Sequence, residues 1–391
     1  MKRFSAQYVY TNTGPPLKRP VIATDDDGTI IAVTDTGGNL PESATLAWHN
    51  GIIVPGFINS HCHLELSSFR GLVEPAAGLP GFIGSIRRLR ETHTGDAEAA
   101  ALKHDRIMHS EGIVACADIC NGTDSFSAKS RSDIDYINLI EVFGVSEEAA
   151  GRRFGEALAV AKAATQLSLK HNIVPHSAYA ISLQLLKLIK EYKNGSPVTS
   201  VHFMESDAEA ELLNENRGLL LESYRNSGID TGNMSLPPSH TNAVLDHITP
   251  DGNLILVHNT FADEATVDAV SSRGNLFWCL CPNSNIHITG RIPPAAMLHG
   301  KGCTIVIGTD SLASNDRLSI LTEMITLQEA FPDIPLGDMV AWATINGARA
   351  IGADHIYGSI EPGKKPGLLL IENCDLPALR LTPDSKIKRL I

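Results

Sequence analysis

The sequence is poor in aromatic and charged residues and has no regular cysteine pattern. Aromatic residues make up 5% and charged residues 19% of its 391 positions, whereas hydrophobic residues make up 43%. This composition is sufficient for a large core and excludes a disordered chain. The seven cysteines are an odd number without short regular spacing, which argues against a disulfide framework and favours reduced thiols.

Long apolar runs are missing as well. No apolar run follows Lys2 and Arg3, and the longest apolar stretch, residues 51–58, is interrupted by Pro55. The sequence therefore predicts a cytoplasmic protein with neither a leader nor a membrane span. The net charge is −12 with the basic residues dispersed, so we expect a small-molecule substrate and no nucleic-acid or membrane partner. A homodimer is neither indicated nor excluded.

Several catalytic motifs are absent. The chain has no Gly-x-Ser-x-Gly elbow, no phosphate-binding loop, no His-Glu-x-x-His and no Pro-Cys-x-x-Cys. Cys279 and Cys281 form an isolated pair, which we interpret as core thiols. These absences leave histidines and carboxylates as the candidates for chemistry.

The middle of the chain alternates apolar strands with helical segments. Eight strands are predicted, at 57–62, 113–118, 136–142, 172–176, 198–204, 254–258, 276–280 and 304–310. Helices are predicted at 98–110, 147–169, 183–193, 208–225, 262–272, 317–330 and 336–350. Eight buried strands that alternate with helices are typical of an α/β fold, a parallel (β/α)8 TIM barrel, here over residues 55–355.

Both chain ends are β-like. Short strands are predicted at 7–11, 20–24 and 29–35, and residues 358–371 return to a β pattern after the last helix. We expect residues 1–54 and 356–391 to form one small β-sandwich-like domain beside the barrel.

A His-x-His pair lies at the end of the first barrel strand. Side chains alternate on a strand, so His61 and His63 point to the same side and Cys62 points to the other. Two imidazoles so arranged can chelate one divalent metal, with zinc preferred and iron the alternative. On its own, such a short motif is more often two unrelated core histidines.

Other strand ends add polar groups at the same rim, where barrel enzymes carry their catalytic residues. The fourth strand ends in His176, the fifth in His202 with Glu205 beyond it, the sixth in His258 and the eighth in Asp310. His202 and Glu205 suit a metal ligand followed by an acid/base group. A random scatter of 15 histidines would rarely give this arrangement.

In this order, these residues resemble the mononuclear deaminase branch of the amidohydrolase superfamily, which includes guanine, cytosine, S-adenosylhomocysteine and aminofutalosine deaminases and related chlorohydrolases. Supporting stretches are 55–59, 281–285 and 313–315. The resemblance implies that one metal is bound by His61, His63, His202 and Asp310.

It also implies roles for the other residues at the rim. Glu205 would carry protons, His258 would hold the attacking water and Asp310 would help to orient it, while His176, Arg70, Ser284 and Asn285 are assigned to substrate contact. Binuclear relatives carry a bridging lysine where His176 stands, so one metal is expected.

The predicted activity is hydrolytic release of ammonia from an amino-substituted, purine-like or nucleoside-like N-heterocycle. The first alternative is hydrolysis of another leaving group or ring bond, as in chlorohydrolases or imidazolonepropionase-like enzymes. The second is a catalytically inactive metal-binding protein, because a fold alone does not imply a function.

Overall fold

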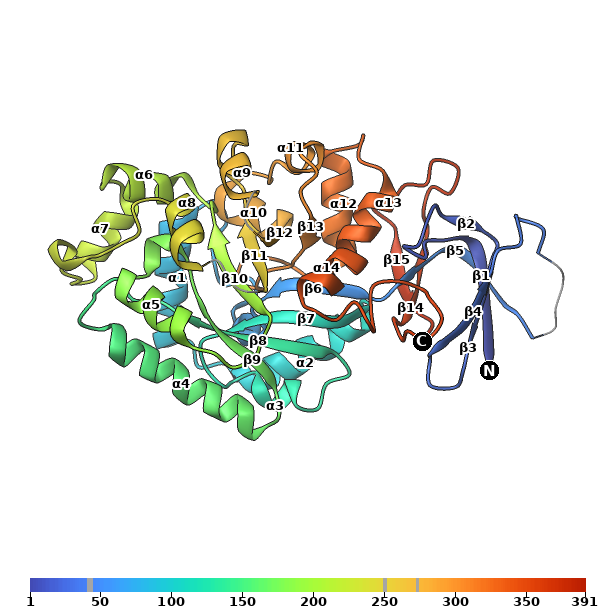
Figure 1. Ribbon diagram of the computed structural model, residues 1–391, viewed down its shortest axis with the longest axis horizontal. Helices are drawn as coiled ribbons and strands as arrows, with labels where there is room; N and C mark the ends of the chain where they lie inside the picture. The colour runs from blue at the N-terminus through green and yellow to red at the C-terminus, as the bar shows by residue number, and fades with distance from the viewer. Residues whose placement is uncertain (41–44, 249–251, 272–273) are drawn as a thin grey trace.

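The computed structural model describes residues 1–40, 45–248, 252–271 and 274–391. Figure 1 shows a helix-rich part around parallel strands and, at the other end of the molecule, a sheet beside which both termini lie. The predicted helix end at residue 272 and residues 41–44 of the predicted β unit lie outside the described residues. No helix of the described ranges combines the length and apolar character that crossing a membrane requires.

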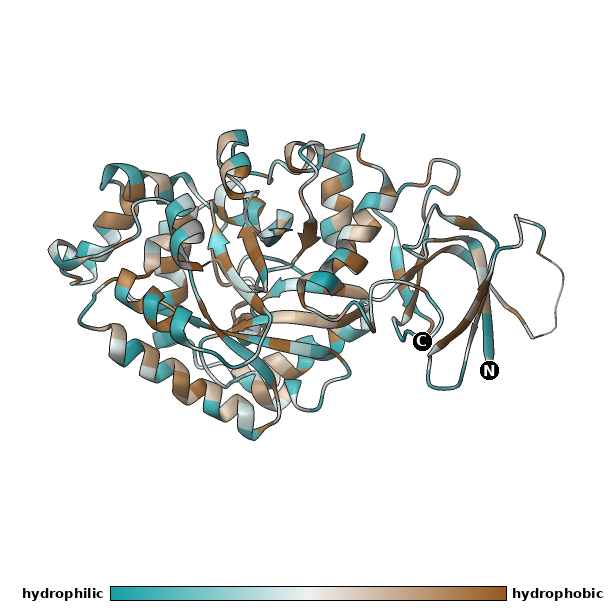
Figure 2. Ribbon diagram, in the orientation of Figure 1, coloured by the Kyte–Doolittle hydropathy of each residue, from teal (hydrophilic) through white to brown (hydrophobic). Residues whose placement is uncertain are grey.

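The helix-rich part contains two four-stranded parallel sheets, ordered β6-β7-β8-β9 and β10-β11-β12-β13. Their strands are β6 (Phe57–Cys62), β7 (Ile113–Cys120), β8 (Asp135–Val142), β9 (Lys170–Pro175), β10 (Val198–Phe203), β11 (Asn253–His258), β12 (Asn275–Leu280) and β13 (Ile305–Ile307). These are the eight predicted strands, with ends shifted by a few residues. The strands are largely buried, as parallel strands covered on both faces are, and Figure 2 shows apolar stretches along several of them.

The two sheets meet at both of their edges through contacts near the carboxyl ends of the strands. The amide of His202 donates to the carbonyl of His176 (2.8 Å), and the amide of Asp310 donates to the carbonyl of His61 (3.0 Å). Isolated parallel bridges join Ser177 to His202 and Cys62 to Asp310 at the same places. The residues at the two seams are therefore the ones singled out in the sequence.

Helices follow most of the strands (Figure 1). The longer ones are α1 (Gly78–Thr92), α2 (Ala97–Ser110), α4 (Ala150–Gln166), α5 (Leu183–Glu191), α6 (Asp207–Glu215), α7 (Leu219–Asn226), α9 (Glu264–Ser271), α10 (Pro282–Thr289) and α12 (Ile320–Ala330). The shorter ones are η1 (Leu64–Phe69), α3 (Phe126–Lys129), η2 (Ala178–Ala180), η3 (Thr231–Asn233), α8 (His240–Asn242), η4 (Ala243–Ile248), α11 (Ala295–Gly300), α13 (Leu336–Ala341), η5 (Trp342–Asn346) and α14 (Gly347–Ala350).

The helix pattern differs from the prediction in two places that matter for the site. The predicted helix 208–225 is two helices, because Asn216 (φ 49°) takes the left-handed conformation that ends α6, and Gly218 (φ 94°) is the non-helical N-cap of α7. The helix α1 was not predicted, although Leu79, Phe82, Ile83 and Ile86 recur at helical spacing. Its Gly-Leu-Pro-Gly start concealed that periodicity.

Strands from both chain ends share one seven-stranded sheet, ordered β15-β14-β5-β1-β3-β4 with β2 paired to β1. The strands are β1 (Lys2–Val9), β2 (Leu17–Lys18), β3 (Val21–Thr24), β4 (Ile30–Thr34), β5 (Ala47–Pro55), β14 (Leu368–Glu372) and β15 (Lys386–Arg389). Backbone pairing joins them into one continuous sheet, because β5 pairs with β1 on one side and β14 on the other.

Candidate metal and active site

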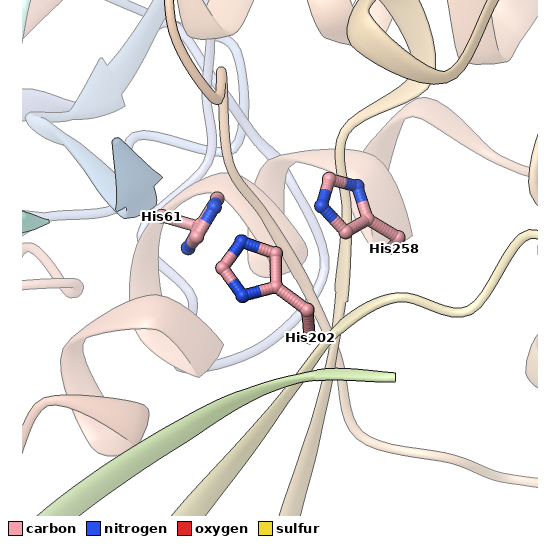
Figure 3. Close-up of side chains that lie close together, drawn as sticks. All are labelled: His61, His202 and His258. Carbon is pink, nitrogen blue, oxygen red and sulfur yellow. The ribbon is translucent and has the colours of Figure 1, made fainter. Parts of the chain in front are cut away.

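Imidazoles from three different strands converge at one point (Figure 3). His61 lies on β6, His202 on β10 and His258 at the end of β11. Their ring centroids are 5.0 Å apart for His61 and His202, 5.7 Å for His61 and His258, and 5.2 Å for His202 and His258. All three are buried. Parallel strands end at the same rim, so residues far apart in the sequence become neighbours there.

His63 and Asp310 complete the cluster. Nε2 of His63 lies 3.2 Å from Nε2 of His61, and Oδ1 of Asp310 lies 3.5 Å and 3.8 Å from these two nitrogens. Two ligands at tetrahedral angles around zinc, each about 2.1 Å from the ion, stand roughly 3.4 Å apart. The donor set therefore fits a transition metal in both chemistry and spacing.

The protonation states also suit a metal. Burial holds the pKa of His61 and of His202 well below the ordinary value for an imidazole. Burial alone would raise the pKa of Asp310, but the nearby His63 and His258 outweigh it, and the net pKa is lowered. Neutral imidazoles and an ionised carboxylate are the forms that bind metal ions.

Further contacts fix the orientation of these groups. Nδ1 of His202 donates to the carbonyl of His176 (2.9 Å), which leaves Nε2 directed at the cluster. Oδ2 of Asp310 accepts from the hydroxyls of Ser284 (2.5 Å) and Ser314 (2.9 Å), so Oδ1 faces the imidazoles. The amide of Asn285 contacts Nδ1 of His258 at 3.0 Å. These neighbours orient the ligand set as a rigid unit.

The backbone at the rim is strained where the functional side chains emerge. Met204 (φ 50°), His258 (φ 78°) and Asp310 (φ 55°) take the left-handed conformation although none is glycine. Such residues persist only where the surrounding structure holds them, and they concentrate at functional sites.

Glu205 stands beside the cluster. Its Oε1 lies 3.7 Å from Nε2 of His258, and the residue is 3% exposed. Burial raises the pKa of Glu205 well above its ordinary value, and the charges of Glu209 and Asp310 raise it further. A buried carboxyl with a raised pKa next to a metal-type cluster is suited to hold and release a proton.

The cluster forms the floor of a cavity of about 400 Å³. One wall is apolar, with Leu79 and Phe82 from α1 and Leu220 and Tyr224 from α7. His63, His202, Glu205, His258 and Asp310 all line the cavity. An apolar pocket with a few convergent polar groups is the usual form of a small-molecule site.

His176 also lines the cavity, as a substrate contact would. Its Nδ1 donates to Oε1 of Glu141 (2.7 Å), and its Nε2 lies 3.0 Å from the hydroxyl of Tyr179. Burial alone would lower the pKa of His176, but the Glu141 carboxylate raises it above its ordinary value. Sequence reasoning missed Glu141, although a glutamate at the end of the apolar strand β8 was a usable signal.

The other three assigned substrate contacts lie elsewhere. Ser284 and Asn285 are fully buried behind Asp310 and His258 and are not among the described residues that line the cavity. Arg70 is exposed at the end of η1 and is not in the lining either. Of the arginines in the described part of the chain, Arg87, Arg90 and Arg153 line it. The first two belong to α1, the helix that was not predicted.

A second cluster lies on the opposite face of β6. Cys62, Cys116 and Asp118 have ligand-type atoms within 4.8 Å of one another. The buried ammonium of Lys129 lies 2.5 Å from Oδ2 of Asp118 and supplies its positive partner. Burial raises the pKa of both thiols, so this cluster has neither the charge nor the thiolates of a metal site.

Several proteins of known activity resemble this chain over most of its length. Adenosine deaminase of Helicobacter pylori is 24% identical over 327 residues, covering 82% of this chain and 79% of that protein. The 5-methylthioadenosine/S-adenosylhomocysteine deaminase of Haloarcula marismortui is 26% identical over 386 residues, covering 93% and 82%.

Solved structures show the same fold. Aminofutalosine deaminase of Helicobacter pylori, solved with methylthio-coformycin, superposes with a TM-score of 0.80 at 21% identity and covers 95% of this chain and 92% of its own. An adenosine deaminase from Xanthomonas campestris with bound zinc gives 0.66 at 19% identity, covering 97% and 86%. A sequence model of the amidohydrolase family matches residues 52–389. The chain therefore belongs to the amidohydrolase family.

Proposed function

We propose that the protein is a metal-dependent hydrolytic deaminase that releases ammonia from the amino-substituted heterocycle of an adenosine-like nucleoside. The observation that carries the proposal is the placement of Glu205 and His258 beside a His/Asp cluster at the floor of an apolar cavity. The chain's similarity to proteins named as adenosine and S-adenosylhomocysteine deaminases supports the nucleoside class.

In this proposal, His61, His63, His202 and Asp310 hold one divalent ion, with zinc preferred and iron the alternative. The bound metal supplies a Lewis acid that lowers the pKa of a water toward neutrality. His258 remains outside the ligand set. Its Nδ1 accepts from the Asn285 amide, so a neutral His258 carries its proton on Nε2 and donates it to the nucleophilic water.

Glu205 moves the protons. Its carboxylate takes a proton from the water, and its raised pKa lets it keep that proton until a ring nitrogen accepts it. Protonation of the ring makes the carbon that bears the amino group electrophilic. Departure of ammonia then needs one further proton at the leaving nitrogen, which Glu205 can relay from the same water.

The cavity walls favour a nucleoside with a substituent beyond the ribose. Apolar side chains of α1 and α7 line the cavity, and Arg87, Arg90 and Arg153 lie among the lining residues. Oε1 of Glu65 neutralises Arg90, and Glu156 contacts Arg153. We propose that His176 contacts the substrate at the floor, where it faces Tyr179.

We further propose that the eight parallel strands close into a (β/α)8 barrel over residues 55–355, and that residues 1–54 with 356–391 form a separate small β domain. The hydrogen bonds at the two seams support the closed barrel. The shared seven-stranded sheet supports the domain formed by the chain ends.

Metal analysis of the purified protein combined with an ammonia screen tests the function. The screen should contain adenosine, 5-methylthioadenosine, S-adenosylhomocysteine, guanine and cytosine, with a chlorotriazine as a chloride-release arm. We expect one metal per chain and ammonia from an adenosine-type substrate. Chloride release without ammonia, or full metal content without any turnover, would contradict the proposal.

A further inference from the structure

A buried carboxylate, Glu209, lies directly beneath Glu205. Its Oε1 accepts from the backbone amides of Glu205 (2.7 Å) and Ser206 (2.9 Å). Ser206 is the N-cap of α6, and Glu209 is the third residue of that helix. The usual capping box joins such a glutamate to the N-cap amide alone. Here the glutamate also holds the amide of the proposed proton carrier.

The backbone that leads to Glu205 needs such a restraint. Met204 takes a left-handed conformation (φ 50°) between the strand that carries His202 and the start of α6. The amide of Phe261 holds the carbonyl of Met204 (2.9 Å) on one side, and Glu209 holds the next two amides on the other. The position of the Glu205 side chain therefore depends on the contact with Glu209.

The second oxygen of Glu209 has its own partner. Oε2 lies 2.5 Å from Nε2 of His240, and both residues are buried. The ring of His240 also packs edge-on against Phe203, the last residue of β10 (centroids 5.7 Å). An ionised carboxylate in a core is costly without a charged or hydrogen-bonded partner. His240 is the partner of Oε2, while the two backbone amides occupy Oε1.

The chain segment between Glu209 and His240 also forms part of the cavity. It includes α7, whose Leu220 and Tyr224 line the apolar wall. The hydroxyl of Tyr224 donates to the carbonyl of Tyr179 (2.8 Å), which ties this segment to the side of the cavity where His176 lies. The same continuous segment therefore forms part of the apolar cavity wall and places His240 next to Glu209.

We propose that Glu209 and His240 are positioning residues that hold the Glu205 carboxyl against the reacting ring, acting through the backbone amides of Glu205 and Ser206. The inference rests on the proposed function of Glu205. It adds that proton transfer at Glu205 depends on the buried pair of Glu209 and His240, which lie 31 positions apart in the sequence.

Hydrogen exchange of the Glu205 and Ser206 amides tests the geometry without any turnover. Glu209→Ala should lower the protection of these two amides while metal content stays at the parent level. Glu209→Gln keeps the acceptor oxygen and should restore the protection. Glu215→Ala, at an exposed position of the same helix, is the matched control and should change neither property. Unchanged protection in Glu209→Ala would overturn the proposal.

Kinetics test the action through Glu205. Glu209→Ala should reduce kcat roughly 10-fold to 100-fold with KM nearly constant, the usual effect of a misplaced reacting group. In a Glu205→Gln background the same change should have no further effect on kcat, because the group being positioned is gone. An equal loss in both backgrounds would overturn the proposal.

Two further arms keep the test decisive. If Glu209→Ala does not fold, His240→Ala takes its place, because it removes the partner of Oε2, and it should also lower the protection of the two amides; an unchanged value would overturn the proposal. Failure of the parent enzyme to release ammonia contradicts the proposed function, whereas amide protection tests the positioning role independently of it.

Discussion

Replacement of Glu205 by glutamine separates proton transfer from metal binding. Glutamine keeps the size of the side chain and one acceptor oxygen but cannot take up a proton at neutral pH. In the structure, the Glu205 side chain is 4% exposed and its Oε1 lies 3.7 Å from Nε2 of His258. It belongs to none of the groups of described residues that could hold a metal. Metal content should therefore stay at the parent level.

The expected loss is in turnover. A positioned acid/base group contributes roughly 10²-fold to 10⁴-fold, or about 3–5 kcal/mol of activation free energy. Because Glu205 is almost fully buried, bulk water has little access to replace it, which favours the upper part of that range. Substrate binding should change much less than kcat, since the proton moves only on the way to the transition state.

The assay is steady-state ammonia release with elemental analysis of the same preparations. Parent and Glu205→Gln enzymes should contain equal metal, differ in kcat by the stated factor and have similar KM values. Loss of metal from the variant would reassign Glu205 as a ligand. Nearly full activity would refute the assignment of Glu205 as proton carrier and make His258 the first candidate.

Three further predictions concern metal binding and stability. His61→Ala should lose the metal, whereas Cys62→Ala should keep it, because Cys62 lies on the opposite face of β6; elemental analysis decides both. Gly308→Ala should weaken metal binding, since a Cβ there would stand 2.8 Å from the Cβ of His61, while Gly151→Ala has open space and should bind as the parent does in a zinc titration. Burial raises the pKa of Glu323 from its ordinary value of 4.5 to about 8 in the folded state. Between these two pH values, Glu323 is protonated in the folded protein and ionised in the unfolded chain. The parent protein therefore loses stability as pH rises through this range, whereas Glu323→Gln does not titrate. The free energy of unfolding of Glu323→Gln should rise relative to that of the parent by up to about 1.4 kcal/mol per pH unit between roughly pH 5 and 8. Chemical denaturation measures this difference, and a difference that stays constant with pH would contradict the prediction.

The pair His61 and His63 was readable from the sequence because strand alternation is a local property. The same holds for His202 and His258, which lie in the last two positions of β10 and β11, and for Asp310, which follows β13. In a parallel fold the strand ends meet at one rim, so the sequence alone predicts that these side chains lie together.

The helix pattern was only partly readable. Local periodicity predicts most helices, but Asn216 and Gly218 split one predicted helix into α6 and α7. The start of α1 concealed a helix that carries Arg87 and Arg90 into the cavity lining, and Arg70 was assigned in their place. Which arginine reaches a cavity depends on how a helix packs over the rim, and residue type alone does not determine this.

The sequence by itself predicted the candidate metal ligands, the proposed proton carrier Glu205 and the alternation of strands and helices, since each depends on residues adjacent in the chain. Only the tertiary structure brought Glu141 to His176 and His240 to Glu209. Those contacts join residues 35 and 31 positions apart, and no local pattern specifies which buried carboxylate meets which imidazole. The packing of the intervening segments determines these pairs, because a buried carboxylate needs a hydrogen-bonding partner and only the folded core brings the two side chains together.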